Sequence, residues 1–225
     1  MRAQKAKFDV GSSGKVSGLL LLPERARACL VLAHGAGAGM THPFLEALAQ
    51  GLASRAMATF RFQFPYMEKK TRRPDPPPVA KACVRYAVEE AARLCPGRPL
   101  FAGGKSFGGR MTSQAQSKEP LPDVRGIVFL GFPLHPSGKP SDARGVHLAD
   151  VKVPMLFLQG MRDTLAELSL LKPVCKRLRN ATLHIVDEAD HSFHVPARTG
   201  RKDADVRSEL EETIVGWADR ILSQS

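Results

Sequence analysis

The sequence lacks any apolar run that could cross a membrane. The longest candidate, Leu19–Leu22, is far shorter than the roughly 20 residues that a membrane helix needs. The N-terminus, MRAQKAKFDV, is basic but has no apolar stretch behind it, so it does not resemble a secretory signal. We therefore expect a cytoplasmic protein without membrane association.

Cysteine is also scarce, and its spacing excludes the common cysteine-based sites. The four cysteines are Cys29, Cys83, Cys95 and Cys175, and they form neither a C-x-x-C pair nor a zinc-binding pattern. A chain of this size can build a core without disulfides, so we expect four reduced, mostly buried thiols. The sequence predicts neither a metal site nor a cofactor.

Acidic residues are outnumbered, which gives a net charge of +11 and an isoelectric point of about 9.9. No recognition motif and no alternation of basic with aromatic residues accompanies this charge, so we do not expect nucleic-acid binding. Most of the charge is spread along the chain, apart from a cluster over residues 69–73. A positive field raises the local concentration of anions, which favours an anionic substrate.

The pattern of apolar segments predicts one α/β domain over residues 1–225. Apolar runs such as CLVLA, IVFL and MLFLQ are typical of strands covered by helices on both faces, and therefore of a doubly wound, mainly parallel sheet. The first strand is expected to pair antiparallel at the edge. The expected strands are Lys15–Leu22, Cys29–Ala33, Ala58–Phe62, Leu100–Gly103, Gly126–Leu130, Met155–Gln159 and Thr182–Val186. The expected helices are Pro43–Arg55, Val79–Leu94, Phe107–Ser117, Ala166–Arg179 and Asp205–Leu222.

Two segments interrupt this alternation. Phe64–Pro78 is basic and rich in proline, too polar and broken for a core element, and Leu134–Asp150 has no clear periodicity. Both follow strands, so both should emerge at the carboxyl edge of the sheet, where α/β folds bind ligands. We expect them to shape a pocket there.

A candidate nucleophile lies at the end of a predicted strand. Gly104, Ser106 and Gly108 form G-x-S-x-G between the strand at Leu100–Gly103 and the helix that follows. The pattern suits a tight strand-to-helix turn that raises a serine hydroxyl above the sheet, with small residues where the elements approach closely. A phosphate-binding loop is disfavoured, because the required glycine five residues before Gly104 is replaced by Pro99.

A second glycine-rich loop, His34–Gly39, can complete an oxyanion hole. A tetrahedral intermediate needs two backbone N–H donors. We expect one from Phe107, directly after the serine, and the other from Ala36, with Gly37 as the alternative. We expect His34 to brace this loop by hydrogen bonds.

The acid and the base are predicted in two later strand-end loops. Asp163 follows the strand Met155–Gln159, and His191 follows Thr182–Val186, which gives the chain order serine, acid, histidine. A serine needs such a base, and the carboxylate orients the imidazole. His194 is a weaker alternative base. The acidic neighbours of His191, namely Asp187, Glu188 and Asp190, are expected to be solvated.

The motifs taken together resemble a known family. The stretches HGAGAGM, FRFQFPYMEKKTRRPDPPP, GGKSFGGRM, FLGFPLHPSGKP, LFLQGMRD and ADHSF are similar to the hydrolase-like family that includes the third regulatory subunit of the non-specific-lethal chromatin complex. That family is similar to dienelactone hydrolases. The resemblance implies an α/β-hydrolase fold with little or no lid domain and a triad on Ser106, Asp163 and His191. The dienelactone enzymes use cysteine where this chain has Ser106, so their lactone substrate does not follow.

These observations predict a serine hydrolase that acts on a small acyl substrate. The reaction would be acyl transfer to water from an ester, thioester or amide through an acyl-serine. Met40 and Phe193 are expected to line the pocket. The alternative is an interaction protein that retains the hydrolase fold but works by binding, as the eukaryotic relative suggests.

Overall fold

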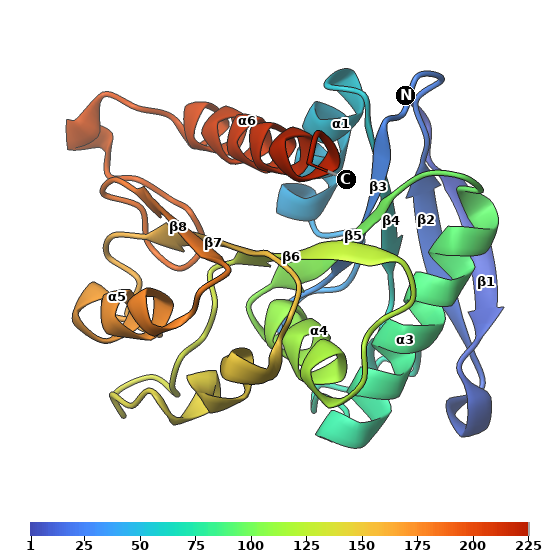
Figure 1. Ribbon diagram of the computed structural model, residues 1–225, viewed down its shortest axis with the longest axis horizontal. Helices are drawn as coiled ribbons and strands as arrows, with labels where there is room; N and C mark the ends of the chain where they lie inside the picture. Colours follow the sequence, from blue (N-terminus) through green and yellow to red (C-terminus); the bar gives the residue numbers. More distant parts are fainter. Residues whose placement is uncertain (225) are drawn as a thin grey trace.

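The computed structural model describes residues 1–224. Eight strands of this part form one sheet in the order β1-β2-β4-β3-β5-β6-β7-β8 (Figure 1). Strands β3 to β8 are parallel to one another, and β2 runs antiparallel to both of its neighbours, β1 and β4. The strands are β1 (Gln4–Asp9), β2 (Lys15–Leu21), β3 (Ala28–Ala33), β4 (Met57–Phe62), β5 (Leu100–Lys105), β6 (Val124–Leu130), β7 (Met155–Gly160) and β8 (Ala181–Val186).

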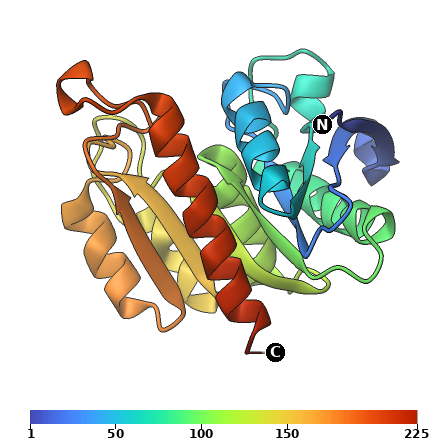
Figure 2. The ribbon, with the colours of Figure 1, turned by 90° about the horizontal axis from the view of Figure 1, so that it is seen from above.

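Helices cover both faces of the sheet. Helices α1 and α6 lie on one face, and α3, α4 and α5 lie on the other (Figures 1 and 2). The helices are α1 (Pro43–Ser54), α2 (Pro65–Glu68), α3 (Pro77–Leu94), α4 (Phe107–Lys118), α5 (Leu168–Arg177) and α6 (Asp203–Leu222). The predicted doubly wound, mainly parallel sheet is confirmed.

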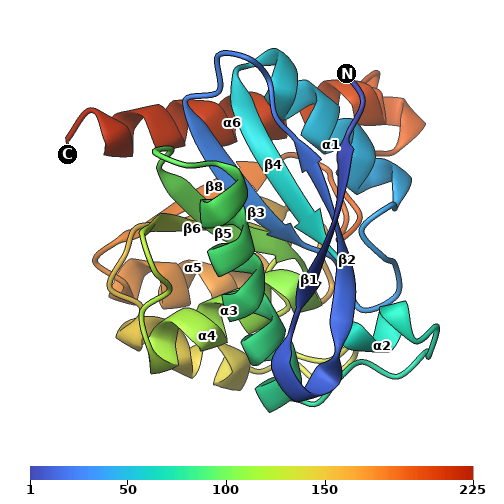
Figure 3. The same ribbon diagram turned by 90° about the vertical axis from the view of Figure 1, so that its right-hand side faces the viewer.

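The amino-terminal edge differs from the expectation. The strand predicted at Lys15–Leu22 is present as β2, but it is not the edge, because it pairs with β4 on one side and with β1 on the other (Figure 3). Strand β1 has the polar sequence QKAKFD, and only Phe8 of its residues is buried. An edge strand with one buried side chain carries little apolar signal, so periodicity did not reveal it.

The two faces of the sheet have separate apolar cores. Strands β3 and β7 are buried along their whole length, as their uninterrupted apolar sequences predict.

All four cysteines are buried and free, as expected from their spacing in the sequence. Within the part of the chain that the structure describes, every helix is too short or too polar to span a bilayer.

The two irregular segments leave the carboxyl ends of β4 and β6. The first contains α2, and the second contains the 3-10 helix η2 (Ala143–Asp150). The expectation that Phe64–Pro78 avoids the core is wrong at its start, where the rings of Phe64 and Tyr66 are buried. Both rings pack against Phe107, with centroids 5.4 and 6.4 Å away. The segment therefore anchors the turn that carries Ser106.

Candidate active site

Ser106 lies in a sharp turn between β5 and α4. Its φ is 50° and its ψ is −114°, a backbone conformation that costs free energy in a residue with a side chain. The flanking glycines permit the turn. A Cβ atom on Gly104 would lie 2.4 Å from the carbonyl oxygen of Ala33, and one on Gly108 would lie 2.5 Å from that of His34. The end of β3 thus leaves no room for a side chain at either position.

The structure brings the three predicted triad side chains together. His191 Nε2 lies 2.9 Å from Ser106 Oγ, and His191 Nδ1 lies 2.7 Å from Asp163 Oδ2. The three residues come from the turns after β5, β7 and β8, which meet at the carboxyl edge of the sheet. A hydroxyl, an imidazole and a carboxylate in this order can transfer a proton away from an attacking serine.

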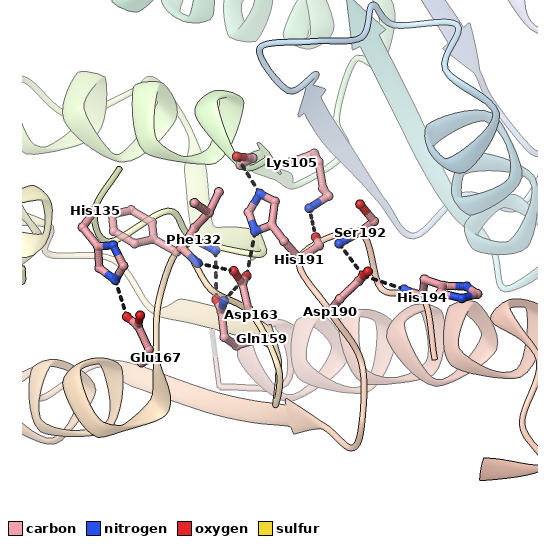
Figure 4. A network of polar contacts seen from close by, with 12 residues as sticks. Lys105, Phe132, His135, Gln159, Asp163, Glu167, Asp190, His191, Ser192 and His194 are labelled. Atoms are coloured by element: carbon pink, nitrogen blue, oxygen red, sulfur yellow. Dashed lines mark hydrogen bonds and ion pairs between the residues drawn. The ribbon is translucent and has the colours of Figure 1, made fainter. Parts of the chain in front are cut away.

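The carboxylate of Asp163 is buried and fully engaged (Figure 4). Besides His191, it accepts hydrogen bonds from the Gln159 side-chain amide and from the Leu165 backbone N–H, the latter at 2.8 Å. Gln159 in turn accepts the backbone N–H of Phe132 at 2.9 Å. Charge-assisted bonds of this kind fix the orientation of the carboxylate. The sequence analysis missed Gln159, whose only signal is a polar residue near the end of a buried strand.

The loop that follows β3 is held by His34. The backbone N–H of Phe64 donates to His34 Nε2 at 3.0 Å, so Nε2 is unprotonated and Nδ1–H donates to the Gly35 carbonyl at 2.7 Å. Burial lowers the pKa of His34 to about 4, which keeps the ring neutral. The Tyr66 hydroxyl donates to the Ala36 carbonyl at 2.8 Å. The predicted bracing role of His34 is confirmed.

Three backbone N–H groups of the described residues, those of Phe107, Ala36 and Gly37, lie near the serine without protein acceptors. Phe107 is the first residue of α4, where the N–H precedes the helical hydrogen-bond ladder. Within residues 1–224, the N–H groups of Ala36 and Gly37 donate to no other residue. Both the positive end of α4 and the turn of the β3 loop therefore offer donors to an anionic oxygen.

Two cavities open on either side of Ser106 and share Ala36, Ser106 and Leu165. The first, which we call the apolar cavity, has a volume of about 320 Å³. The second, the arginine cavity, has a volume of about 600 Å³. The apolar cavity is also lined by Gly35, Gly37, Ala38, His42, Phe44, Leu45, Lys105, His191 and Ser192. The arginine cavity is also lined by Arg73, Arg110, Arg144, Phe107, Asp75, His135, Ser137 and several prolines.

Neither expected pocket residue lines these cavities. Phe193 is buried in the core beneath α1 and stacks on Phe44, with ring centroids 5.8 Å apart. Met40 holds the β3 loop through its backbone, which accepts from Arg61 and donates to Gln63. The sequence placed both near the site, but Phe193 packs behind the cavity wall and Met40 acts through its backbone.

The comparisons with known proteins agree with this geometry. Residues 26–219 match the family model described as Alpha/beta hydrolase domain. The chain belongs to this family. Its fold is similar to that of a dienelactone hydrolase from Anabaena variabilis, at 20% identity and a TM-score of 0.76 over 96% of this chain and 97% of that one. It is also similar to an α/β serine hydrolase without a lid from Xanthomonas campestris, at 19% identity and a TM-score of 0.75 over 96% and 95% of the two chains. The predicted α/β-hydrolase fold with little or no lid is confirmed.

Two polar residues near His191 in this α/β hydrolase, His194 and Asp190, lie outside the candidate triad. His194 is exposed and pairs with Asp203 at 2.9 Å, away from the serine. Asp190, expected to be solvated, instead accepts the backbone N–H groups of Ser192 and His194 at 2.7 and 3.0 Å. It therefore shapes the turn that presents His191.

A second serine–histidine pair joins α4 to η2. Ser113 Oγ lies 2.8 Å from His147 Nε2, but Ser113 is completely buried and also bonds to the Arg110 carbonyl at 3.0 Å. His147 has no hydrogen-bonded carboxylate among the described residues. Among residues 1–224 of this α/β hydrolase, Ser106 is therefore the one serine that combines an acid–histidine pair with an adjoining cavity.

Lys105 is a feature of the site that the sequence analysis did not identify. Lys105 is half-buried; its ammonium donates to the backbone carbonyl of His191 and lies 5.1 Å from the centroid of the Phe193 ring (Figure 4). Burial lowers its pKa to about 8, against the opposing effect of Asp163 and Asp190. Its position directly before the serine in G-x-S-x-G was the only available signal.

Proposed function

We propose that the chain is a serine hydrolase that cleaves a small ester, thioester or amide through an acyl-serine at Ser106. The observation that carries the proposal is the continuous hydrogen-bonded path from Ser106 Oγ through His191 to the buried carboxylate of Asp163, at 2.9 and 2.7 Å. This path begins at a hydroxyl that faces two cavities. A serine without a base at hydrogen-bond distance is a weak nucleophile at neutral pH.

The reaction proceeds in two steps. Ser106 Oγ adds to the acyl carbon as its proton passes to His191 Nε2, and His191 returns that proton to the leaving group. Water then adds to the acyl carbon, giving a proton to His191, and the Ser106 oxygen departs with that proton. Asp163 keeps the imidazole in the required tautomer and stabilises its charged form.

The oxyanion would be held by the N–H of Phe107 and that of Ala36. The choice of Ala36 over Gly37 is supported by position, because Ala36 borders both cavities next to Ser106 and Gly37 does not border the arginine cavity. Replacing Ala36 by Pro removes one donor and should lower kcat on the order of 100-fold. A Gly37→Pro variant with the larger loss would transfer the assignment to Gly37.

Covalent labelling tests the proposal directly. The folded protein is treated with a fluorophosphonate probe, and the modified peptide is located by mass spectrometry. We expect one adduct on Ser106, none in Ser106→Ala, and normal labelling of Ser113→Ala, which removes the other serine paired with a histidine. A chain that acts only by binding, as the resemblance to the chromatin-complex family also suggests, would give no adduct and no ester turnover. That result would overturn the proposal.

A further inference from the structure

Three arginines from separate parts of the chain meet in the arginine cavity. Arg73 comes from the segment after α2, Arg110 from α4 and Arg144 from η2. Arg110 lies one helical turn beyond the serine, and its backbone N–H donates to the Ser106 carbonyl at 3.1 Å. A cluster of guanidinium groups thus forms part of the wall next to the candidate nucleophile.

These guanidinium groups have no anionic partner within residues 1–224. Several other arginines of the chain pair with acids, such as Arg55 with Glu211 at 2.7 Å and Arg93 with Glu90 at 2.8 Å. The three in the cavity make no ion pair and no side-chain hydrogen bond to a described residue. The cavity's one carboxylate, that of Asp75, accepts the backbone N–H of Tyr66 at 3.0 Å.

Unpaired like charges in a partly enclosed space are costly. Burial lowers the pKa of Arg110, and the neighbouring charge of Arg144 lowers it further. A bound anion would compensate for both effects, since guanidinium groups form paired hydrogen bonds with carboxylate and phosphate oxygens. Holding the guanidinium groups close together therefore costs free energy, and an anionic ligand would offset this cost.

The position of the base decides which half of a substrate enters this cavity. His191 borders the apolar cavity and not the arginine cavity. The base must reach the leaving-group oxygen to protonate it, so the leaving group occupies the apolar cavity. The acyl group then extends along Phe107, which lines the arginine cavity, toward the three arginines.

We propose that the substrate is an ester with an apolar alcohol and an acyl chain that ends in an anionic group, held by Arg110 and Arg144. This inference rests on the proposed function. Attack by Ser106 breaks the bond between the acyl carbon and the alcohol oxygen, and the alcohol leaves with the proton from His191. Water then hydrolyses the acyl-serine, which turns the acyl carbon into a carboxylate and leaves the terminal anionic group unchanged. The acid product is therefore a dicarboxylate or a carboxylate that also carries a phosphoryl group.

The test compares esters that differ only in charge and in the side that carries it. Benzyl hydrogen glutarate, benzyl glutaramate and benzyl 4-phosphonobutanoate place a carboxylate, a neutral amide and a phosphonate on the acyl side. The pentanoyl ester of 4-(hydroxymethyl)benzoate places the carboxylate on the alcohol side. We expect kcat/KM for one of the two acyl-side anions to exceed that for glutaramate by about 10- to 100-fold, the size of a charge-assisted contact. The favoured anion identifies the group as carboxylate or phosphoryl. A preference for the alcohol-side anion, or none for either anion, would overturn the inference.

Variants separate the anion site from general damage. Arg110→Gln and Arg144→Gln should each lower the ratio of kcat/KM between the preferred anionic ester and glutaramate by about 10-fold or more. Arg93→Gln, a change in an exposed arginine of α3, should leave the ratio unchanged. A change at Arg110 can destabilise the chain because Arg110 lies within α4. Arg144→Gln then provides an independent measurement of the ratio. An unchanged ratio in a folded Arg144→Gln variant would contradict the assignment.

Labelling keeps this result distinct from the proposed function. Each protein is also treated with the fluorophosphonate probe. An adduct on Ser106 with turnover of benzyl glutaramate but no preference for either anion removes the inference and leaves the hydrolase. No adduct and no turnover of any ester removes both.

Discussion

Lys105 donates a hydrogen bond from its half-buried ammonium to the backbone carbonyl of His191 (Figure 4). The residue before the candidate nucleophile thus holds the loop that carries the candidate base. Replacement by Met keeps most of the apolar stem but removes this bond. We expect Lys105→Met to lower kcat on the order of 10- to 100-fold, because the imidazole is no longer fixed against Ser106. Ester turnover by the two proteins measures this.

The same lysine predicts a pH dependence with a defined sign. The folded chain releases the Lys105 proton near pH 8, whereas the unfolded chain holds it to about the ordinary pKa of 10.5. The unfolded state therefore binds more protons between these values, and the contribution of Lys105 to the free energy of unfolding rises with pH across this window. Activity should fall as the pH passes 8, because the charge beside the His191 loop disappears. Both inflections should be absent in Lys105→Met; their persistence would contradict the assignment.

Asp163→Asn tests the orienting carboxylate. The neutral amide oxygen cannot form a charge-assisted hydrogen bond with His191 Nδ1–H. The new NH₂ group would also face the donors that now bond to the carboxylate, such as the Gln159 amide. We expect kcat to fall by about 10⁴-fold with the fold retained. Asp187→Asn, a change at an exposed residue in the same strand-end loop as His191, is the matched control and should be active. Equal activity of the two variants would remove Asp163 from the mechanism.

Ser106→Gly should abolish turnover and yet stabilise the chain. Ser106 has a φ of 50°, which glycine adopts without steric cost. We expect the free energy of unfolding to rise by about 1 kcal/mol, the relief of strain less the greater chain entropy of glycine. Denaturant unfolding measures the change. Ser106→Ala is the control, since it removes the hydroxyl but keeps the strain; an equal gain in both variants would exclude the backbone explanation.

Gly108→Ala should be strongly destabilising. Its Cβ would lie 2.5 Å from the His34 carbonyl oxygen and 2.7 Å from the Ala33 Cβ, so β3 or α4 must move. We expect a loss of about 3 kcal/mol or more. Gly216→Ala in α6, where the nearest atom is 3.9 Å away, should instead gain about 0.5–1 kcal/mol. Thermal unfolding of both variants distinguishes local crowding from a general effect of replacing glycine.

The sequence was most informative where a residue follows a buried strand. Ser106 comes directly after β5, and Asp163 and His191 lie three and five residues past the ends of β7 and β8. Parallel strands bring such positions to one edge. Lys105 and Gln159 escaped notice because their roles depend on hydrogen bonds to atoms distant in sequence. The meeting of Arg73, Arg110 and Arg144 was equally invisible, since the segments after β4 and β6 must both fold against α4 before the three arginines become neighbours.

The shared wall of Ala36, Ser106 and Leu165 has a consequence for how specificity can change. The two cavities otherwise draw on different segments: the β3 loop, α1 and the His191 loop for one, and the segments after β4 and β6 with the start of α4 for the other. If the proposed substrate orientation holds, substitutions in one cavity would retune the accepted alcohol without altering the accepted acid, and the reverse. The candidate nucleophile would then stand between two halves that evolve separately.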